Sequence, residues 1–233
     1  MALERTSLPR TAQAIAADEL RAAIVRGDIS PGAKIRQEAT ARELGVSLIP
    51  LREALRTLAS EGTLTYRPQR GYFVTEMHDE TIRELYEARA LLEAHIESIA
   101  VALVDEEDIA VMRDQLRIQE RAVEDRDAVE MIAANRRLHF TIFNRCENPW
   151  LLRFVTQLWD SADPYRVLAY RRMWLDADRH VIPAEVLAEH ERIVDALERG
   201  KHDRVVKLLE RHRERSEVFL QALTQLPEPT QRA

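Results

Sequence analysis

Apolar residues recur at the spacing of α-helices through the first sixty residues of the chain. The segment "TAQAIAADELRAAIVRGD" has this spacing and ends at Gly27, and "RQEATARELG" predicts a shorter helix that ends at Gly45. Ser47 suits the N-cap of a third helix, and Pro50 falls in the first turn of that helix, where its missing N–H costs little. The third helix has one apolar face, which predicts that it packs on a core. The members of that face are Leu51, Ala54, Leu55 and Leu58.

After Gly62 the apolar spacing changes from helical to alternating. In "TLTYRPQRGYFVTE" apolar and polar residues alternate on both sides of "PQRG", which is typical of the turn between two strands. The order of helix, helix, helix and hairpin predicts a winged helix-turn-helix domain. We place this DNA-binding domain at residues 1–76.

From Asp79 onward the apolar spacing is helical again. The pattern predicts six helices, at about residues 79–103, 106–124, 127–145, 149–173, 183–199 and 202–225. Pro164 leaves a break in the fourth helix open, and Gly200 marks a tight turn between the last two, which are then antiparallel. The fold class is therefore mainly α, with an amino-terminal winged helix-turn-helix and an all-α six-helix bundle at residues 77–233.

The net charge of −6 argues against a uniformly basic nucleic-acid binder, but it hides an asymmetry. Residues 1–76 contain 11 Lys and Arg against 9 Asp and Glu, a balance of +2, whereas residues 77–233 contain 23 against 31, a balance of −8. The first domain can therefore approach phosphates more easily than the second. The start lacks an apolar leader, no apolar run is long enough to span a membrane, and the single Cys146 fits a reducing compartment. We therefore expect a cytoplasmic protein without membrane contact.

The third helix and the hairpin tip carry the polar side chains that a DNA-binding surface needs. Arg52 and Arg56 project from the face opposite the apolar one and can reach guanine edges or phosphates. A solvated arginine face beside a solubilising hairpin is the alternative, and the complete order of helices and wing argues against it. The candidate contacts with double-stranded DNA are Ser47, Leu48, Ile49, Arg52, Arg56, Arg67, Gln69, Arg70 and Gly71.

The segments "AIVRGDISPGAKI", "ARELGVSLIPLREAL" and "RGYFV" resemble the amino-terminal domain of the GntR superfamily of bacterial transcription regulators. The resemblance covers about residues 10–76 and implies that Arg52 contacts DNA and that Arg70 lies at the wing, in the minor groove. The family usually has arginine where this chain has Leu48 and threonine where it has Ile49. These departures predict a different target sequence, in which the two apolar side chains could touch thymine methyl groups.

Three of the seven histidines stand where helices can bring them together. His139 follows Asn135 by four residues, so both point from one face of the same helix. His190 lies ten residues before Gly200 and His212 twelve residues after it, which puts them at similar heights on an antiparallel pair. Three imidazoles with one oxygen suit a divalent metal, zinc or nickel better than manganese. For each histidine taken alone, an ordinary buried or surface role is the alternative.

The segments "ELYEARALLEAHIESIAVAL", "NRRLHFTIFNRCENPWL" and "EHERIVDALERGKHDRVVKLLERH" resemble the FCD ligand-binding domain, the all-α partner in the FadR-like branch of GntR regulators. Many members of that family bind a metal through an Asp-x3-His pair and two later histidines. The resemblance carries this ligand set onto Asn135, His139, His190 and His212. A neutral amide then stands where the family has an aspartate, which weakens the expected attraction for a metal.

The same resemblance implies an effector site near the start of the helical domain. Arg89 matches an arginine that the family uses near its effector, where a guanidinium can pair with a carboxylate. A salt bridge to Glu93, four residues later, is the equal alternative. Tyr86 is a candidate for the lining of the same site, with a place in the plain core as the alternative.

These observations favour a transcription regulator that is not an enzyme. We expect a homodimer on a two-fold DNA operator, controlled by a small organic acid that binds with a divalent metal in the helical domain. A metal-dependent hydrolase built on the histidines is the alternative function, but "HERIV" at His190 is not the H-E-x-x-H pattern of such enzymes. A scaffold that binds metal or DNA without an effector is the third possibility.

Overall fold

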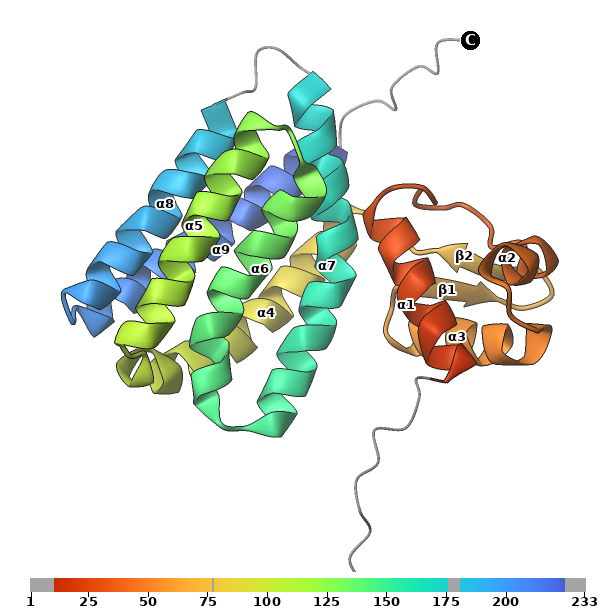
Figure 1. Cartoon of the computed structure of the whole chain (residues 1–233), viewed down its shortest axis with the longest axis horizontal. Helices are drawn as coiled ribbons and strands as arrows, with labels where there is room; N and C mark the ends of the chain where they lie inside the picture. The colour runs from red at the N-terminus through yellow and green to blue at the C-terminus, as the bar shows by residue number, and fades with distance from the viewer. Residues whose placement is uncertain (1–10, 77, 176–180, 225–233) are drawn as a thin grey trace, which may run out of the picture. The chain divides into compact units, whose positions relative to one another are not determined.

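Two units, each with its own hydrophobic core, divide the chain at residue 76 (Figure 1). The computed structural model describes residues 11–76, 78–175 and 181–224. The elements of the first unit are α1 (Ala12–Val25), α2 (Gln37–Leu44), α3 (Leu48–Ser60), β1 (Leu64–Arg67) and β2 (Gly71–Val74). This is the predicted winged helix-turn-helix.

The predicted apolar face of α3 forms the centre of the first unit. Its four members, Leu51, Ala54, Leu55 and Leu58, are fully buried. They pack with buried residues of α1 and the hairpin, and each large aliphatic side chain contributes about 1.5–3 kcal/mol by leaving water. Gly45 ends α2 with a φ of 66°, a left-handed conformation that costs glycine little, and so turns the chain directly into α3.

The entrance to α3 and the wing follow the prediction with one difference. Ser47 is the N-cap residue of α3, but its side chain makes no capping hydrogen bond. The two strands pair antiparallel, with Leu64 opposite Val74 and Arg67 opposite Gly71. The "PQRG" segment is therefore the turn at the tip of the wing, as expected.

Within the described ranges, six long helices build the second unit. They are α4 (Asp79–Ala100), α5 (Glu106–Glu124), α6 (Ala128–Phe143), α7 (Pro149–Leu175), α8 (Val181–Glu198) and α9 (His202–Thr224). Their most extensive contacts form a closed ring, in the order α4, α7, α6, α5, α8, α9 and back to α4, and α4 also contacts α6 while α7 contacts α9 (Figure 1). The six-helix bundle is confirmed, and residue 225 of the predicted last helix lies outside the described residues.

Polar residues cap the start of α5 and of α7. The Asp105 side chain accepts two backbone N–H groups, at 3.0 Å each, in a capping box at the start of α5. The Asn148 side chain does the same for α7, at 3.1 and 3.2 Å. Gly200, with a φ of 62°, makes the tight turn that returns α9 along α8.

The break left open at Pro164 does not occur. Helix α7 runs without interruption from Pro149 to Leu175 and contains Pro164 in its interior. Proline removes one helical hydrogen bond, but Ala162 and Val167 on either side of it are fully buried against neighbouring helices. Packing therefore overrides the local preference. Among the described helices, none is long and apolar enough to cross a membrane.

Candidate metal centre and nucleic-acid interface

Three histidines from three helices converge inside the second unit. His139 comes from α6, His190 from α8 and His212 from α9, and one ligand nitrogen from each lies within 4.8 Å of the others. The Nε2 atoms of His190 and His212 are 3.2 Å apart, and the two rings are tilted by 55°. The similar heights counted from Gly200 therefore do bring the two histidines together. All three side chains are buried.

Two polar groups behind the rings determine which nitrogen faces inward. His190 Nδ1 lies 2.7 Å from Gln119 Oε1, and His212 Nδ1 lies 2.9 Å from Glu189 Oε2. Both oxygens are acceptors, so each Nδ1 carries the proton and each Nε2 presents a lone pair to the other. Two lone pairs at 3.2 Å repel one another unless a cation lies near both, which is the arrangement that a metal stabilises.

His139 supplies a third ring nitrogen to the group. Its Nε2 is buried and has no hydrogen-bond partner among the described residues, although buried ring nitrogens normally have one. Burial lowers the pKa of His139 and of His190 well below the usual value, and it lowers the pKa of His212 to about 3. The positive charge of Arg166 adds to each of these shifts. The imidazoles are therefore neutral at ordinary pH, the form that binds metal.

The donor set fits zinc or nickel, but it does not balance their charge. Three imidazole nitrogens are a frequent set for such ions, and the group of three contains no carboxylate. A divalent ion held by neutral rings alone keeps its full charge in a buried place. An anionic ligand from solution is the natural completion of such a site.

Asn135 occupies the position where the resemblance predicted a fourth ligand, and Arg166 of α7 lies behind it. The Asn135 amide satisfies both of its neighbours when its nitrogen donates to His190 Nε2 at 3.2 Å and its oxygen accepts from Arg166 at 3.1 and 2.9 Å. In this orientation the nitrogen, not the oxygen, faces the histidines. The predicted oxygen ligand is therefore present at the site but turned toward Arg166.

A layer of buried ion pairs connects α4 with α9. Arg89 Nε donates to Glu93 Oε1 at 2.7 Å, and Trp159 Nε1 donates to the same oxygen at 2.8 Å. Arg213 donates to Glu93 Oε2 at 2.9 Å and to Glu97 Oε1 at 3.0 Å. Burial opposes the charge of Glu93, but Arg89 and Arg213 hold its pKa below the usual value, whereas burial raises the pKa of Glu97 to about 7. The layer is closely packed and nearly neutral in charge.

Arg89 thus makes the salt bridge to Glu93 that we considered as the alternative to effector binding. One of its terminal nitrogens, NH1, is nevertheless buried without a hydrogen-bond partner among the described residues, and so is the hydroxyl of Tyr86. The guanidinium lies over the rings of Tyr86 and Trp159, at 4.6 and 4.5 Å from their centroids. The salt bridge therefore leaves one polar atom of each predicted effector residue without a hydrogen-bond partner among the described residues.

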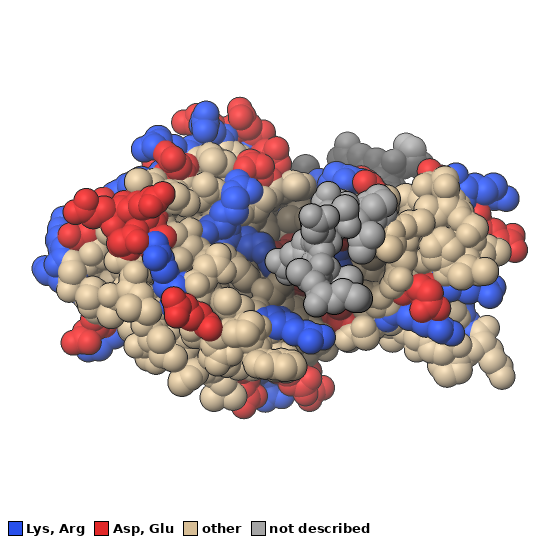
Figure 2. All heavy atoms as spheres, turned by 60° about the horizontal axis from the view of Figure 1, so that its bottom comes forward, with Lys and Arg blue, Asp and Glu red and all other residues tan. Residues whose placement is uncertain are grey.

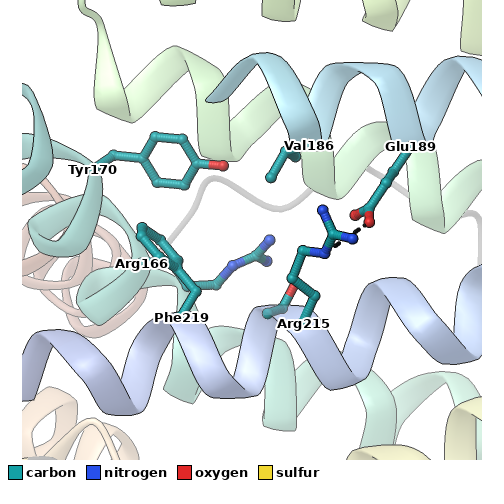
Figure 3. Close-up of a pocket in the computed structure, with 7 residues that line it drawn as sticks. Arg166, Tyr170, Val186, Glu189, Arg215 and Phe219 are labelled. Carbon is teal, nitrogen blue, oxygen red and sulfur yellow. Dashed lines mark ion pairs between the residues drawn. The ribbon is translucent and has the colours of Figure 1, made fainter. Parts of the chain in front are cut away.

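A small pocket opens between α7, α8 and α9 beside this layer (Figure 3). Its lining residues are Arg166, Tyr170, Val186, Glu189, Arg215, Ser216 and Phe219. Figure 3 shows the guanidinium of Arg166 and the hydroxyl of Tyr170 pointing into the space between the helices, opposite Arg215, which pairs with Glu189 at 2.9 Å. The free volume is about 20 Å³, room for a few atoms at most. Arg89 and Tyr86 do not line it.

On the DNA-binding unit, α3 presents its two arginines to solvent. Arg52 Nε donates to Gln37 Oε1 of α2 at 3.1 Å, and Arg56 pairs with Glu53 at 3.0 Å. The Gln37 contact directs the Arg52 side chain while it uses only Nε, so the two terminal nitrogens remain for a base or a phosphate. Arg52 and Arg56 both line a hollow on the surface of this unit.

Leu48 and Ile49, the two apolar residues at the start of α3 that differ from the family pattern, are exposed to different extents. Ile49 is 76% exposed, so it can meet a DNA base edge without rearrangement. Leu48 is half-buried and packs against the core of the unit. Leu48 is therefore partly a core residue, and Ile49 is the better placed of the two for a thymine methyl group.

The wing presents the predicted cationic tip. The guanidinium of Arg67 lies 4.7 Å from the centroid of the Phe73 ring, which keeps that arginine close to the strands. Gln69 and Gly71 have positive φ values, 61° and 96°, and Arg70 between them is exposed. On the face drawn in Figure 2, basic and acidic side chains are interspersed.

Three residues of these sites were missed from the sequence. Arg166 follows Trp159 by seven residues, or two helical turns, so the two lie on the same buried face of α7. A charged residue on that buried face was the feature of the sequence that could have indicated a functional role for Arg166. Gln119 lies on the same buried face of α5 as Met112 and Leu116, so a polar residue at this position could likewise have indicated a functional role. Gln37 gave no such indication, because its role depends on how α2 meets α3.

A winged helix-turn-helix joined to a helical bundle with a buried histidine centre defines a class of protein, the ligand-responsive DNA-binding regulators. Comparison with known families identifies the branch. Residues 12–74 match the bacterial regulatory proteins of the gntR family, and residues 84–215 match the FCD domain. The chain belongs to the GntR family of transcriptional regulators, in the FadR-like branch that carries an FCD domain.

Curated relatives and solved structures agree with this assignment. The chain is 32% identical to the Nta operon transcriptional regulator of Aminobacter aminovorans over 69% of this chain and 76% of that protein. It is 29% identical to the transcriptional regulator McbR of Escherichia coli, over 63% and 66% of the two chains. The solved structure of E. coli McbR/YncC has the same fold, with a TM-score of 0.80 at 23% identity over 93% of this chain and 100% of that one. These relatives are transcriptional regulators, so the hydrolase alternative has no support from them.

Proposed function

We propose that this regulator is controlled by a small carboxylate that binds together with a divalent metal at the three histidines. The observation that carries the proposal is the buried group of His139, His190 and His212, whose neutral rings bring one ligand nitrogen each within 4.8 Å of the others. Among the described residues, the Nε2 atom of His139 has no hydrogen-bond partner. Zinc or nickel suits such a group, and an acid that supplies a negative oxygen completes it. The cations around the site, Arg166 above all, favour an anionic effector.

The DNA-binding role rests on α3 and the wing. Arg52 and Arg56 would lie in the major groove with Ile49, and Arg70 would reach the minor groove beside the wing. A homodimer in the cytoplasm would place two such units on a two-fold operator. Binding of acid and metal in the helical domain would then change the population of the DNA-binding arrangement.

Metal content and acid binding test this proposal directly. Purified full-length protein should contain zinc or nickel, or rebind one of them after treatment with a chelator, in a ratio near one ion per chain. A thermal-shift screen against small carboxylic acids should then give stabilisation that depends on the metal. The matched control is His95→Ala, because His95 is an exposed histidine of α4, and it should behave as wild type, whereas His139→Ala should lose metal and acid together. Acid binding that is unchanged without metal and in His139→Ala would contradict the proposal.

A further inference from the structure

Asn135 lies between the metal-binding nitrogens and a buried guanidinium. It comes from α6, it is 1% exposed, and it contacts His190 of α8 on one side and Arg166 of α7 on the other. The amide nitrogen donates to His190 Nε2 at 3.2 Å, and the amide oxygen accepts from both terminal nitrogens of Arg166 at 3.1 and 2.9 Å. The reverse orientation would set donor against donor at Arg166, so one orientation satisfies both neighbours.

This orientation competes with a metal for His190. Because His190 Nδ1 donates to Gln119, its Nε2 lone pair is the one that a metal would use, and the Asn135 amide already occupies it. A metal can take that lone pair only if the amide leaves it. A turn of the amide about its own axis would also bring the oxygen toward the metal, as the family's aspartate would. The turn, however, would press the amide NH2 group against Arg166.

Arg166 is the residue that decides whether this turn is possible. It is 6% exposed, and its carboxylate partner, Asp163, is 3.3 Å away and also pairs with Arg136 at 2.9 Å. The two hydrogen bonds that Arg166 donates to the neutral Asn135 oxygen are weaker than those it would donate to a charged oxygen. Arg166 also lines the pocket between α7, α8 and α9, so an anion can reach it from that side (Figure 3).

We infer that Asn135 couples effector to metal by exchanging partners with Arg166. A carboxylate that enters the pocket takes both terminal nitrogens of Arg166 and releases the Asn135 oxygen. The amide then turns, gives up the His190 lone pair and presents its oxygen to the metal. The inference rests on the proposed function and adds to it the residue that recognises the acid, Arg166, and the reason why metal and acid favour each other. The pocket holds only a few atoms, so the recognised part is a single carboxylate of a small acid.

The coupling is open to measurement with zinc and acetate as probes. Calorimetry gives the zinc affinity of chelator-treated full-length protein without acetate and at saturating acetate, with chloride keeping the ionic strength equal. In wild type, acetate should raise the zinc affinity by about tenfold, within the usual range of allosteric coupling, and zinc should raise the acetate affinity by the same factor. That equality is required because coupling between two binding sites is reciprocal.

Variants separate the exchange from a simple attraction between metal and acid. Arg166→Gln should bind zinc more tightly than wild type without acetate, and the acetate effect should fall to about onefold. Asn135→Asp should also bind zinc more tightly and lose the acetate effect, because its carboxylate holds Arg166 and can offer an oxygen to the metal at the same time. Arg113→Gln is the matched control, since it removes an arginine whose partners, Asp195 and Glu198, play no part in the exchange, and it should keep the tenfold effect.

The outcomes distinguish failure of the partner exchange at Asn135 from failure of the proposed metal and acid site. A wild-type acetate effect that persists in both Arg166→Gln and Asn135→Asp would overturn the exchange, while the metal and acid site itself would stand. Wild-type protein that binds neither zinc nor acetate would overturn the proposed function and the exchange with it. Thermal unfolding of each variant verifies the fold, and the two substituted positions lie on different helices, so the failure of one variant to fold leaves the other decisive.

Discussion

Replacement of Arg52 by alanine should weaken binding to the operator and leave binding to unrelated DNA almost unchanged. In the structure Gln37 holds Arg52 Nε at 3.1 Å, which leaves the two terminal nitrogens to form the fork that pairs with the O6 and N7 atoms of a guanine. One such bidentate pair contributes about 1–3 kcal/mol of discrimination, or roughly 5- to 150-fold in affinity. The side chain is exposed, so its removal should cost the fold little.

Arg56→Ala is the matched control for this prediction. Arg56 lies one helical turn further on in α3, its side chain is 70% exposed, and it pairs with Glu53. We expect it to contact phosphates, so its loss should weaken operator and unrelated DNA by similar factors. Fluorescence anisotropy with an operator selected from random DNA and a scrambled duplex, at one fixed salt concentration, gives both affinities for each variant. If Arg52→Ala weakens both duplexes equally, Arg52 reads no base and the reasoning is refuted.

Three further predictions concern the core, the groove and the metal centre. Burial raises the pKa of Glu97 to about 7, so the wild-type stability linked to its bound proton is present at low pH and lost as the pH rises through 7. In urea unfolding, the stability of Glu97→Gln relative to wild type should therefore rise by roughly 2 kcal/mol from pH 5 to pH 8. A difference between the two proteins that does not change with pH would contradict this. Leu48→Arg should strengthen binding to all DNA and shift base preference, and unchanged binding would place residue 48 away from DNA. His190→Ala should abolish zinc binding in calorimetry, whereas retained affinity would exclude His190 as a ligand.

The helices, the hairpin and the buried face of α3 were predictable because the local sequence preferences and the packing of the core favour the same structure there. The apolar positions of α3 have helical spacing and all four are buried, and Gly45 lies where the left-handed turn is needed. The approach of His190 and His212 also followed from counting residues on either side of Gly200. In each case one rigid helix or one tight turn fixes the geometry.

The rest of the site depends on contacts between helices that are distant in the sequence. The partner of Asn135 is Arg166, which comes from another helix, so the orientation of the amide could not be derived from the Asn-x3-His spacing. The partial burial of Leu48 likewise depends on its packing against the core of the winged unit. At Pro164 the local rule allowed a break, and the buried contacts of α7 prevail.

The most direct test of the account is operator binding under control of the helical domain. An operator selected from random DNA by full-length protein should be a two-fold pseudo-palindrome, and its affinity should change when zinc and a stabilising acid from the thermal-shift screen are added together. The same additions should leave the DNA affinity of His139→Ala unchanged. An operator affinity that is indifferent to metal and acid in wild type, or that responds equally in His139→Ala, would contradict the claim that the three histidines form the regulatory site.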